Sequence, residues 1–230
     1  MGTVRTSRIE NTRRGKPSPS IKRMRVEIHP THPQARLIEM ACDKLRSDGV
    51  LVYPTDSLYA MGCDFQSQAA SRRIREVRRM GKHQFLTLVC RDLSELSTFA
   101  RVDKSSYRLI KSLTPGPYTF ILQATRELPR RLQDPKRKTI GLRIPDHPVT
   151  QALLSALETP MLSATARDGD NDAILVDPID IQEQLGRRVD MVLDAGHGGA
   201  EPTTVVDLSS GNPILVRLGA GNVDNLLDLR

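Results

Sequence analysis

Three consecutive oxygen-bearing side chains, Thr55, Asp56 and Ser57, follow a short apolar run and a proline. The run at residues 50–53 is β-branched and apolar, which predicts a buried strand. Pro54 has no N–H group for a sheet ladder, so the strand is expected to end there and to open into a polar loop. Such a loop can form a binding site. The alternative is a loop that caps its own backbone, which is the commoner use of these residue types.

Two arginines are also placed to do chemistry. Arg78 ends an arginine-rich helix just before a strand expected at residues 85–89, so Arg78 or Lys82 can reach a ligand there. Most other arginines of that helix are expected to face solvent. Arg143 follows a glycine-containing strand and precedes Pro145, so its guanidinium is expected to point out from the end of the strand, where it could hold an anion. The alternative for Arg143 is an ion pair at the surface.

Three other patterns are weaker candidates. His29 and His32 are flanked by prolines that prevent chelation by a helix, so a solvated loop is favoured over a metal site. The aspartates at 168 and 170 do not have calcium-loop spacing. The glycine-rich turn at residues 194–199, around His197, can cradle phosphate with backbone N–H groups but is more often a plain turn. No metal site is predicted.

The elements that must position these residues alternate along the chain. An apolar stripe predicts a first helix that begins after Pro33 and is stopped by Gly49, and Ser67 is expected to cap the arginine-rich helix. Further helices are predicted at residues 93–100, 104–113, 149–157 and 178–185. Strands are predicted at residues 24–28, 50–53, 85–89, 118–122, 139–144, 161–164, 190–193, 203–208 and 214–218. This alternation without a repeat indicates an α/β fold in which helices cover a mixed sheet.

Composition bounds the class of protein. With 230 residues, 38% of them hydrophobic, the chain can bury the core of one large domain. No apolar run approaches the roughly 18 residues needed to span a bilayer, so a soluble protein without a membrane partner is expected. The 3 cysteines are widely spaced and form no Cys-x-x-Cys pair, which argues against a disulfide framework and a zinc knuckle. A reducing, cytoplasmic location is expected.

The net charge of +7 is concentrated at one end. Residues 1–25 contain 8 basic residues against Glu10 alone, so the remainder of the chain is formally neutral. Scattered Gly, Pro and Ser without apolar periodicity predict a disordered basic tail at 1–25 before a domain at 26–230. The tail can bind phosphate backbones. An organellar transit peptide is the alternative, although the amphipathic stripe of such peptides is missing.

Several motifs occur in a characteristic order. They are Val-Tyr-Pro-Thr-Asp-Ser-Leu-Tyr-Ala-Met-Gly-Cys (52–63), Phe-Leu-Thr-Leu-Val (85–89), Thr-Pro-Gly-Pro-Tyr-Thr-Phe-Ile-Leu (114–122), Ile-Gly-Leu-Arg-Ile-Pro-Asp-His-Pro (140–148), Met-Leu-Ser-Ala-Thr (161–165) and Pro-Thr-Thr-Val-Val-Asp-Leu (202–208), the last before Leu-Val-Arg (215–217). Together they resemble the YrdC-like domain family, whose best-known members make L-threonylcarbamoyl-AMP for a tRNA modification. The resemblance covers about residues 36–220.

The resemblance implies a single domain with a twisted sheet of parallel and antiparallel strands and a concave basic site for a nucleotide. Carbamate attack on the α-phosphate of ATP needs positioned cations and N–H donors, with a divalent ion such as Mg²⁺ on the pyrophosphate and no nucleophilic side chain. ATP or an adenylate would thus be a substrate. The residues implied are Thr55 and Tyr59 in the substrate pocket, Thr119 near the amino-acid end, Arg143 and Ser163 on the adenylate side, and Arg217 on phosphate.

Two departures separate the chain from the synthases of the family. They carry Lys-x-Arg where this chain has Arg78-Arg79-Met80, and Met80 cannot hold an anion. They also carry Ser-x-Asn where this chain has Ser163-Ala164-Thr165, so an amide that can donate and accept is lost. Arg78 and Thr165 complete the expected set of binding residues, and no catalytic residue is assigned. The pattern is closer to the YciO branch of the family.

Three functions follow from these expectations. The first is a YciO-like protein that binds threonylcarbamoyl-AMP, or a related adenylate with a threonine-derived group, and performs weak synthesis or its reversal, including hydrolysis. The second is a non-catalytic, ribosome-associated or RNA-binding module. The third is a full synthase. The resemblance also implies tRNA or double-stranded RNA as a partner, with Arg72, Arg75, Arg78, Arg137 and Lys138 as further contacts and the tail as the main one.

Overall fold

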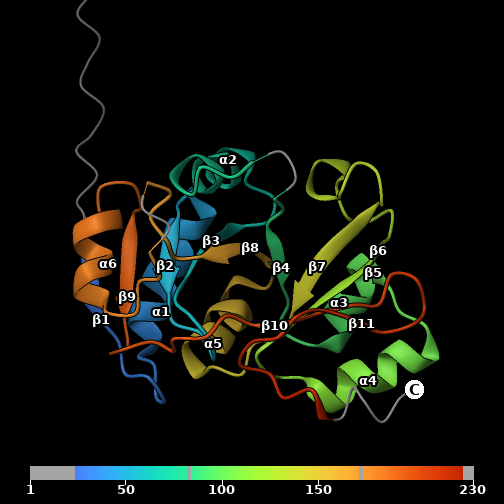
Figure 1. The fold of residues 1–230 in the computed structure, drawn as a ribbon. Coiled ribbons are helices and arrows are strands. Elements are labelled where there is room, and N and C mark those ends of the chain that lie inside the picture. Colours follow the sequence, from blue (N-terminus) through green and yellow to red (C-terminus); the bar gives the residue numbers. More distant parts are fainter. Residues whose placement is uncertain (1–23, 82–83, 171–172, 225–230) are drawn as a thin grey trace, which may run out of the picture.

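The computed structural model describes residues 24–81, 84–170 and 173–224. The strands in this part are β1 (Met24–Glu27), β2 (Leu51–Tyr53), β3 (Ala60–Asp64), β4 (Thr87–Val89), β5 (Ala100–Arg101), β6 (Tyr118–Ala124), β7 (Thr139–Arg143), β8 (Met161–Thr165), β9 (Met191–Asp194), β10 (Thr204–Asp207) and β11 (Ile214–Arg217). They form one sheet in the order β1-β9-β2-β3-β8-β4-β7-β6-β10-β11, with β5 beside β6 (Figure 1).

The sheet is mixed, as the sequence predicts. Strands β1 and β2 run parallel to β9, β4 runs parallel to β7, and β6 runs parallel to β10. The other pairs are antiparallel: β2 with β3, β3 and β4 with β8, β5 and β7 with β6, and β10 with β11. The fold is therefore a single α/β domain, and it confirms the predicted fold class.

Six α-helices in the described residues cover the sheet: α1 (Ala35–Arg46), α2 (Gln68–Val77), α3 (Leu93–Phe99), α4 (Lys104–Leu113), α5 (Pro148–Leu157) and α6 (Pro178–Leu185). A short 3₁₀ helix spans Arg130–Leu132. Helices α1 and α5 pack together in one buried cluster with Leu51 and Tyr53. The second cluster contains Val50 and Val52 with apolar residues of the other four helices. Because successive strand residues point to opposite faces, the two clusters lie on opposite sides of β2.

The predicted helices are present, with small changes at their ends: α3 ends at Phe99, since Ala100 belongs to β5, and α5 begins at Pro148. Ser67 caps α2, since its hydroxyl accepts a hydrogen bond from the Ala70 N–H at 3.0 Å. At the end of α1 the left-handed residue is Asp48 (φ 58°), and Gly49 follows it. The Gly49 N–H donates to Lys44 O at 2.8 Å, and a Cβ on Gly49 would lie 2.4 Å from that oxygen. Gly49 thus ends the helix by close packing, one residue beyond the left-handed turn.

Two strands of the sheet, β3 and β5, are missing from the predicted set, and β4 begins at Thr87 instead of residue 85. Strand β3 contains Gly62, which is normally a poor strand residue. A Cβ at that position would lie 2.5 Å from the ring of Tyr53, so glycine is needed where the tyrosine crosses the strand. The basic tail predicted at 1–25 lies outside the described residues, apart from the start of β1. None of the helices in the described ranges is long and apolar enough to cross a membrane.

Candidate functional site

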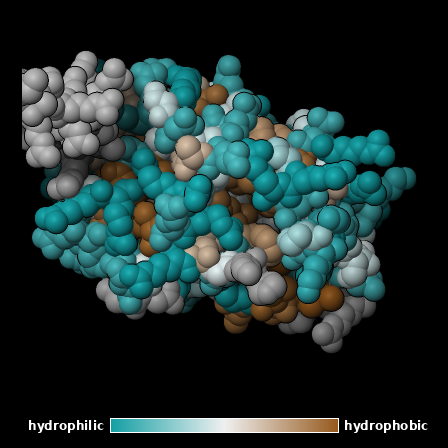
Figure 2. Space-filling view, turned by 90° about the horizontal axis from the view of Figure 1, so that it is seen from above, coloured by the Kyte–Doolittle hydropathy of each residue, from teal (hydrophilic) through white to brown (hydrophobic). Residues whose placement is uncertain are grey.

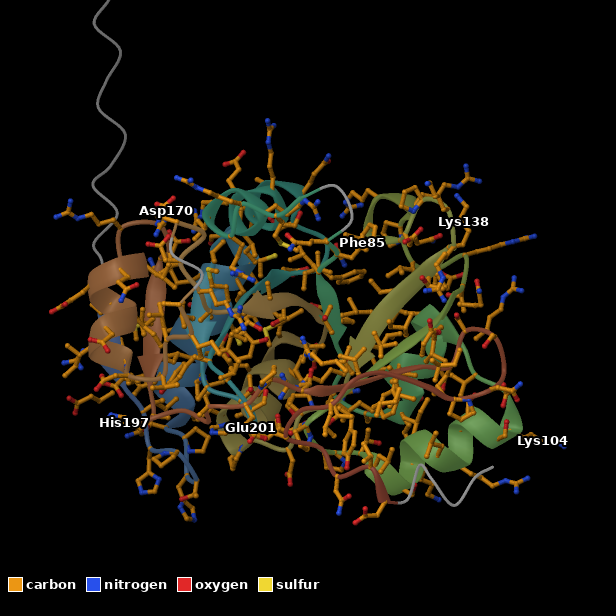
Figure 3. All side chains as sticks on the ribbon, viewed as in Figure 1. Phe85, Lys104, Lys138, Asp170, His197 and Glu201 are labelled. Atoms are coloured by element: carbon orange, nitrogen blue, oxygen red, sulfur yellow. The ribbon has the colours of Figure 1, made fainter. Side chains whose placement is uncertain are left out.

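A cavity of about 520 Å³ lies against the polar side of the central strands. Residues of β3, β4, β6, β7, β8, β10 and β11 line it, together with Arg78, Met80 and the short segment at residues 84–86, all after α2. Phe85 from that segment lies between α2 and β7 in Figure 3. Seen from above, hydrophilic side chains frame hydrophobic groups in the middle of the molecule (Figure 2). The cavity has the volume of an ordinary small-molecule site.

Strand register explains why polar groups meet on this cavity. The pairs Ile121–Gly141, Gly141–Thr87 and Thr87–Ser163 place these four residues in one row across β6, β7, β4 and β8. All four line the cavity, whereas their neighbours Leu142, Leu88 and Leu162 lie in the core. A Cβ on Gly141 would lie 3.4 Å from Thr119 and 3.6 Å from Thr87, so glycine leaves room between two hydroxyl-bearing side chains.

The loop after β2 is held by Arg143. Its Nη2 donates to Thr55 Oγ1 at 3.1 Å and to Ser57 Oγ at 2.9 Å, and it forms an ion pair with Asp56. The side chains of Arg143 and Asp56 are 10% and 9% exposed, so this ion pair is buried. Asp56 Oδ2 also accepts from the Asp146 N–H at 2.9 Å. The expected alternative for Arg143, a surface ion pair, is therefore wrong: the pair lies in the wall of the cavity.

The hydroxyl of Thr55 is used within the loop. It donates to Leu58 O at 2.6 Å and accepts from the Ser57 N–H at 3.1 Å. The loop therefore does cap its own backbone. Thr55 is buried behind the cavity and is not among its lining residues, while Ser57 and Tyr59 are.

Tyr59 brings the glycine-rich turn against the site. Its hydroxyl donates to Gly196 O at 2.7 Å and accepts from the Ala195 N–H at 3.0 Å, and burial raises the pKa of Tyr59 to about 12. A Cβ on Gly198 would lie 2.6 Å from the Tyr59 ring, and one on Gly199 would lie 2.0 Å from Ser57 O. The glycines at 198 and 199 therefore serve close packing.

Replacing Tyr59 by Phe is expected to lower the free energy of unfolding by about 1 kcal/mol, because the Ala195 N–H and the Gly196 carbonyl lose a part-buried hydrogen-bond partner. Adenylate affinity is expected to stay within about twofold, since the ring that faces the cavity is kept. Urea unfolding and calorimetric titration measure the two quantities. Tyr107→Phe, at an exposed hydroxyl, is the matched control. A large loss of affinity without a loss of stability would instead place the Tyr59 hydroxyl on the ligand.

A second set of contacts joins the far wall of the cavity. Thr119 Oγ1 and Thr203 Oγ1 are 2.9 Å apart, and Arg217 donates from Nη2 to Thr203 O at 2.8 Å and to Thr203 Oγ1 at 3.1 Å. Burial lowers the pKa of Arg217, and the charge of Arg167 lowers it further. Both effects penalise the charged guanidinium, so an anion in the cavity would be stabilised beside it.

The end of α2 forms the rim. Arg79 adopts a left-handed conformation (φ 46°), and this turn of the backbone lets Arg78 and Met80 both line the cavity. The Arg79 side chain forms an ion pair with Asp170. Thr165, at the end of β8, lines it as well. Met80 and Thr165, the two departures from the synthase pattern, are therefore both lining residues of this cavity.

The charged and titratable groups on the lining limit its chemistry. Among the described residues, the lining contains Arg78, Arg137, Arg143 and Arg217 but only one carboxylate, Asp134, and no His or Cys. Arg137 pairs with Asp207 at 2.6 Å. The three cysteines are buried elsewhere as free thiols, and burial raises the pKa of Cys42 to about 11 and that of Cys63 to about 12. The arrangement suits binding and polarisation of an anion better than nucleophilic catalysis.

Seven of the eight expected binding residues line this one cavity, and the structure leaves only Thr55 behind its wall. Sequence reasoning missed the contribution of Thr203 and Asp134. Thr203 was visible in the Pro-Thr-Thr motif at residue 202, yet nothing local showed that its hydroxyl would meet that of Thr119. No group of three or more His, Cys, Asp or Glu in the described part of the chain could hold a metal ion.

The family model described as telomere recombination, which covers Sua5, YciO and YrdC, matches residues 43–219. The chain belongs to this Sua5/YciO/YrdC family. It is 48% identical to the uncharacterized protein YciO of Escherichia coli K12 over 200 residues, which are 87% of this chain and 97% of that protein. The crystal structure of E. coli YciO covers 87% of this chain and 98% of its own, with a TM-score of 0.84 at 47% identity. The predicted resemblance, including its YciO branch, is confirmed.

More distant family members carry names that state a reaction or a ligand. The threonylcarbamoyl-AMP synthase of Halorhodospira halophila is 28% identical over 176 residues, which are 76% of this chain and 91% of that protein. The crystal structure of P. abyssi Sua5 complexed with L-threonine has a TM-score of 0.82 at 20% identity and covers 90% of this chain and 60% of its own. The second likeness is one of fold.

Proposed function

We propose that this YciO-like protein binds threonylcarbamoyl-AMP or a related adenylate in the cavity, and that it turns the adenylate over weakly by synthesis or by the reverse reaction, including hydrolysis. The observation that carries the proposal is the meeting of Thr119, Thr203, Arg143 and Arg217 on one cavity in a member of this family. Names of the relatives support the ligand class: a threonylcarbamoyl-AMP synthase and a threonine-bound Sua5.

The proposal gives each end of such a ligand a set of residues. Hydroxyls of Thr119 and Thr203 can bind the polar amino-acid end, and Arg217 beside them can bind a phosphate oxygen. Ser163 accepts a hydrogen bond from the Tyr53 hydroxyl at 3.0 Å, so its own hydroxyl proton is free to turn towards the cavity. Hydrolysis would transfer the carbamoyl carbon from the phosphate oxygen to water and release AMP, with the arginines stabilising the leaving phosphate.

The residues present suit a Mg²⁺ ion that is held mainly by the nucleotide. Mg²⁺ prefers oxygen ligands and is commonly bound through one or two carboxylates together with substrate phosphates. Asp134 is the one carboxylate that the described residues place on the lining, and it would be the protein ligand. When bound, the ion would neutralise charge on pyrophosphate.

Synthesis is proposed to be weak because of Met80 and Thr165. A thioether in place of a cation leaves the pyrophosphate end of ATP with less positive charge, and a hydroxyl cannot donate and accept in the way an amide does. The pre-formed adenylate needs fewer of these groups than ATP does, because it has lost two phosphates. The same cavity can therefore favour the adenylate.

The deciding experiment uses two incubations of the purified chain, followed by nucleotide analysis. One contains threonylcarbamoyl-AMP, and the other contains ATP, threonine and bicarbonate with Mg²⁺. AMP from the first mixture, with little adenylate formed in the second, supports the proposal. Rapid pyrophosphate release that depends on threonine would instead identify a full synthase, and no turnover in either would leave binding without chemistry.

A second candidate function, RNA binding, has one specific observation in its favour: the concentration of net charge in the tail. Deletion should spare β1, because Met24 begins it and Arg25 pairs with Asp194 at 3.0 Å. Removing residues 1–23 deletes seven basic residues. If about half of these basic residues contact phosphates of an RNA duplex, the slope of log affinity against log salt should flatten by about 3. Fluorescence anisotropy at several salt concentrations measures it. An unaltered slope would assign RNA binding to the folded domain.

A further inference from the structure

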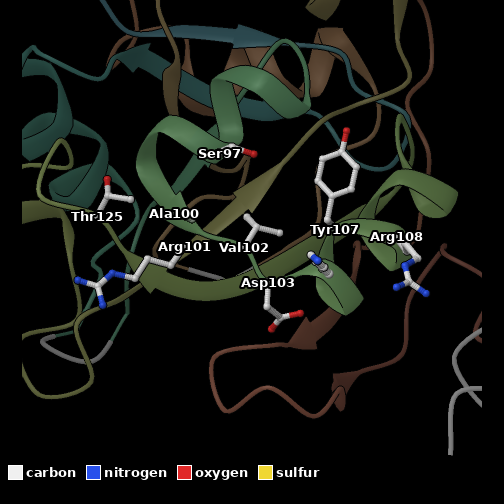
Figure 4. Close-up of a pocket in the computed structure, with 9 residues that line it drawn as sticks. Ser97, Ala100, Arg101, Val102, Asp103, Tyr107, Arg108 and Thr125 are labelled. Carbon is white, nitrogen blue, oxygen red and sulfur yellow. The ribbon is translucent and has the colours of Figure 1, made fainter.

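A second cavity of about 600 Å³ lies far along the sheet from the β2 loop, between the end of α3, strand β5 and the start of α4. Its lining consists of Ser97, Ala100, Arg101, Val102, Asp103, Lys104, Tyr107, Arg108 and Thr125 (Figure 4). No residue of this set lines the first cavity. In the close-up, Arg101 lies on one side of the hollow, and Tyr107 and Arg108 lie on the other.

Three cations on this cavity have no partner in the described part of the chain. The side chains of Arg101, Lys104 and Arg108 are exposed and form no ion pair or hydrogen bond there. Many arginines of the domain are engaged instead, for example Arg73 with Asp190 and Arg188 with Asp168. A cluster of unpaired cations is repulsive unless an anion joins it, so this arrangement is suited to a ligand with more than one negative charge.

The single carboxylate on the cavity is already occupied. Asp103 caps α4, accepting from the Ser105 hydroxyl at 2.6 Å and the Ser106 N–H at 2.8 Å, and these bonds lower the pKa of Asp103. It therefore satisfies the N–H groups at the start of α4 and does not form an ion pair with the three cations. The cations are positioned by regular structure, since Arg101 pairs with Gln123 across β5 and β6.

An exposed aromatic ring lies on the same lining as these cations. Tyr107 is 42% exposed. The buried face of α4 is formed by Ser106, Leu109, Ile110 and Leu113, so Tyr107 contributes little to the core. An exposed ring beside several cations is the combination that binds single-stranded nucleic acid, in which bases stack on aromatics and phosphates lie along a basic groove.

We propose that this cavity binds an unstacked nucleotide of single-stranded RNA, with the base on Tyr107 and the flanking phosphates on Arg101, Lys104 and Arg108. The hydroxyl groups of Ser97 and Thr125 lie on the same lining but donate to Leu93 O and Thr98 O at 2.8 and 2.7 Å. Because these two hydroxyl groups already donate to backbone carbonyls, they are not used to recognise base edges. Binding then depends on the phosphate charge and on the face of the Tyr107 ring. The site recognises RNA without strong sequence preference.

The test uses the full chain and an oligouridylate that contains 4-thiouridine. After irradiation and tryptic digestion, the cross-linked base is expected on the peptide Ser-Ser-Tyr-Arg at residues 105–108. Tyr107→Ala should reduce that cross-link. It should also lower the RNA affinity by about tenfold, measured at a salt concentration that suppresses RNA binding by the basic tail. Arg101→Gln with Arg108→Gln should flatten the salt slope by about 1.4. Arg36→Gln with Arg187→Gln removes the same charge from other exposed positions that have no partner among the described residues, and it should leave the cross-link intact.

Three results would overturn the proposal. The first is a cross-link at other peptides only. The second is an equal loss in the control variant, which would mean that total charge alone matters. The third is full competition by inorganic polyphosphate or by an acidic peptide together with an unchanged Tyr107→Ala affinity, which would reveal a surface for anions or for a protein partner without base stacking.

Discussion

Arg143→Ala is expected to lower the free energy of unfolding by about 3 kcal/mol and to weaken adenylate binding by more than about tenfold. The stability loss follows from the buried ion pair with Asp56: removing one partner leaves an uncompensated charge in the wall of the cavity. The affinity loss has two sources, since a charge-assisted contact is worth about 1.5–3 kcal/mol and the loop that carries Ser57 loses its anchor. Urea unfolding and calorimetry measure the two effects.

A double-mutant cycle separates the ion pair from simple truncation. Asp56→Ala alone should also be strongly destabilising, whereas Arg143→Ala with Asp56→Ala should cost less than the sum of the single changes by at least about 1 kcal/mol. Additive, small effects would contradict a coupled, buried pair. Retention of wild-type affinity in Arg143→Ala, measured on folded protein, would remove Arg143 from the binding site.

Met80→Arg combined with Thr165→Asn is expected to raise ATP-dependent formation of threonylcarbamoyl-AMP by at least about tenfold. The first change adds a cation at the rim of the cavity, and the second adds an amide at the end of β8. Both positions already line the cavity. Gains of this size match the cost of removing one charge-assisted contact or one transition-state donor in other enzymes. The product is measured by chromatography of nucleotides.

Matched controls test whether chemistry or mere substitution is responsible. Met80→Leu with Thr165→Ser changes the same positions without adding charge or an amide, and it should leave synthesis at the wild-type rate. A folded Met80→Arg, Thr165→Asn variant with no gain would mean that the deficit lies elsewhere, for example in the segment around Arg167.

Local patterns were sufficient for most of the fold. The apolar stripe of α1, the Ser67 cap of α2 and the Asp177 cap of α6 are all readable in sequence because each depends on residues a few positions apart. Strand β3 was not, because its central Gly62 is explained only by the ring of Tyr53 on the neighbouring strand. Glycine in a strand has this meaning only when the partner is known.

The candidate site was predictable to a similar extent. Motif order pointed to residues that meet on one cavity, although they come from strands as far apart in sequence as β3 and β11. What could not be predicted were contacts between motifs: Arg143 on Asp56, Thr203 on Thr119, and Tyr59 on Gly196. Each joins segments tens of residues apart, so neither spacing nor propensity carries information about it. Thr55 illustrates the same limit, since its side chain turns back into its own loop.

Calorimetric titration of a hydrolysis-resistant threonylcarbamoyl-AMP analogue into the wild-type chain and Gly141→Val tests most directly whether this cavity binds an adenylate. A Cβ at 141 meets only ordinary contacts, the closest at 3.4 Å, and valine suits a strand, so the variant should fold while its methyl groups occupy space between Thr119 and Thr87. The account predicts one saturable site per wild-type chain and at least about tenfold weaker binding in Gly141→Val, as expected for overpacking by 1–3 kcal/mol. No binding to the wild type, or equal affinity in both proteins, would contradict it.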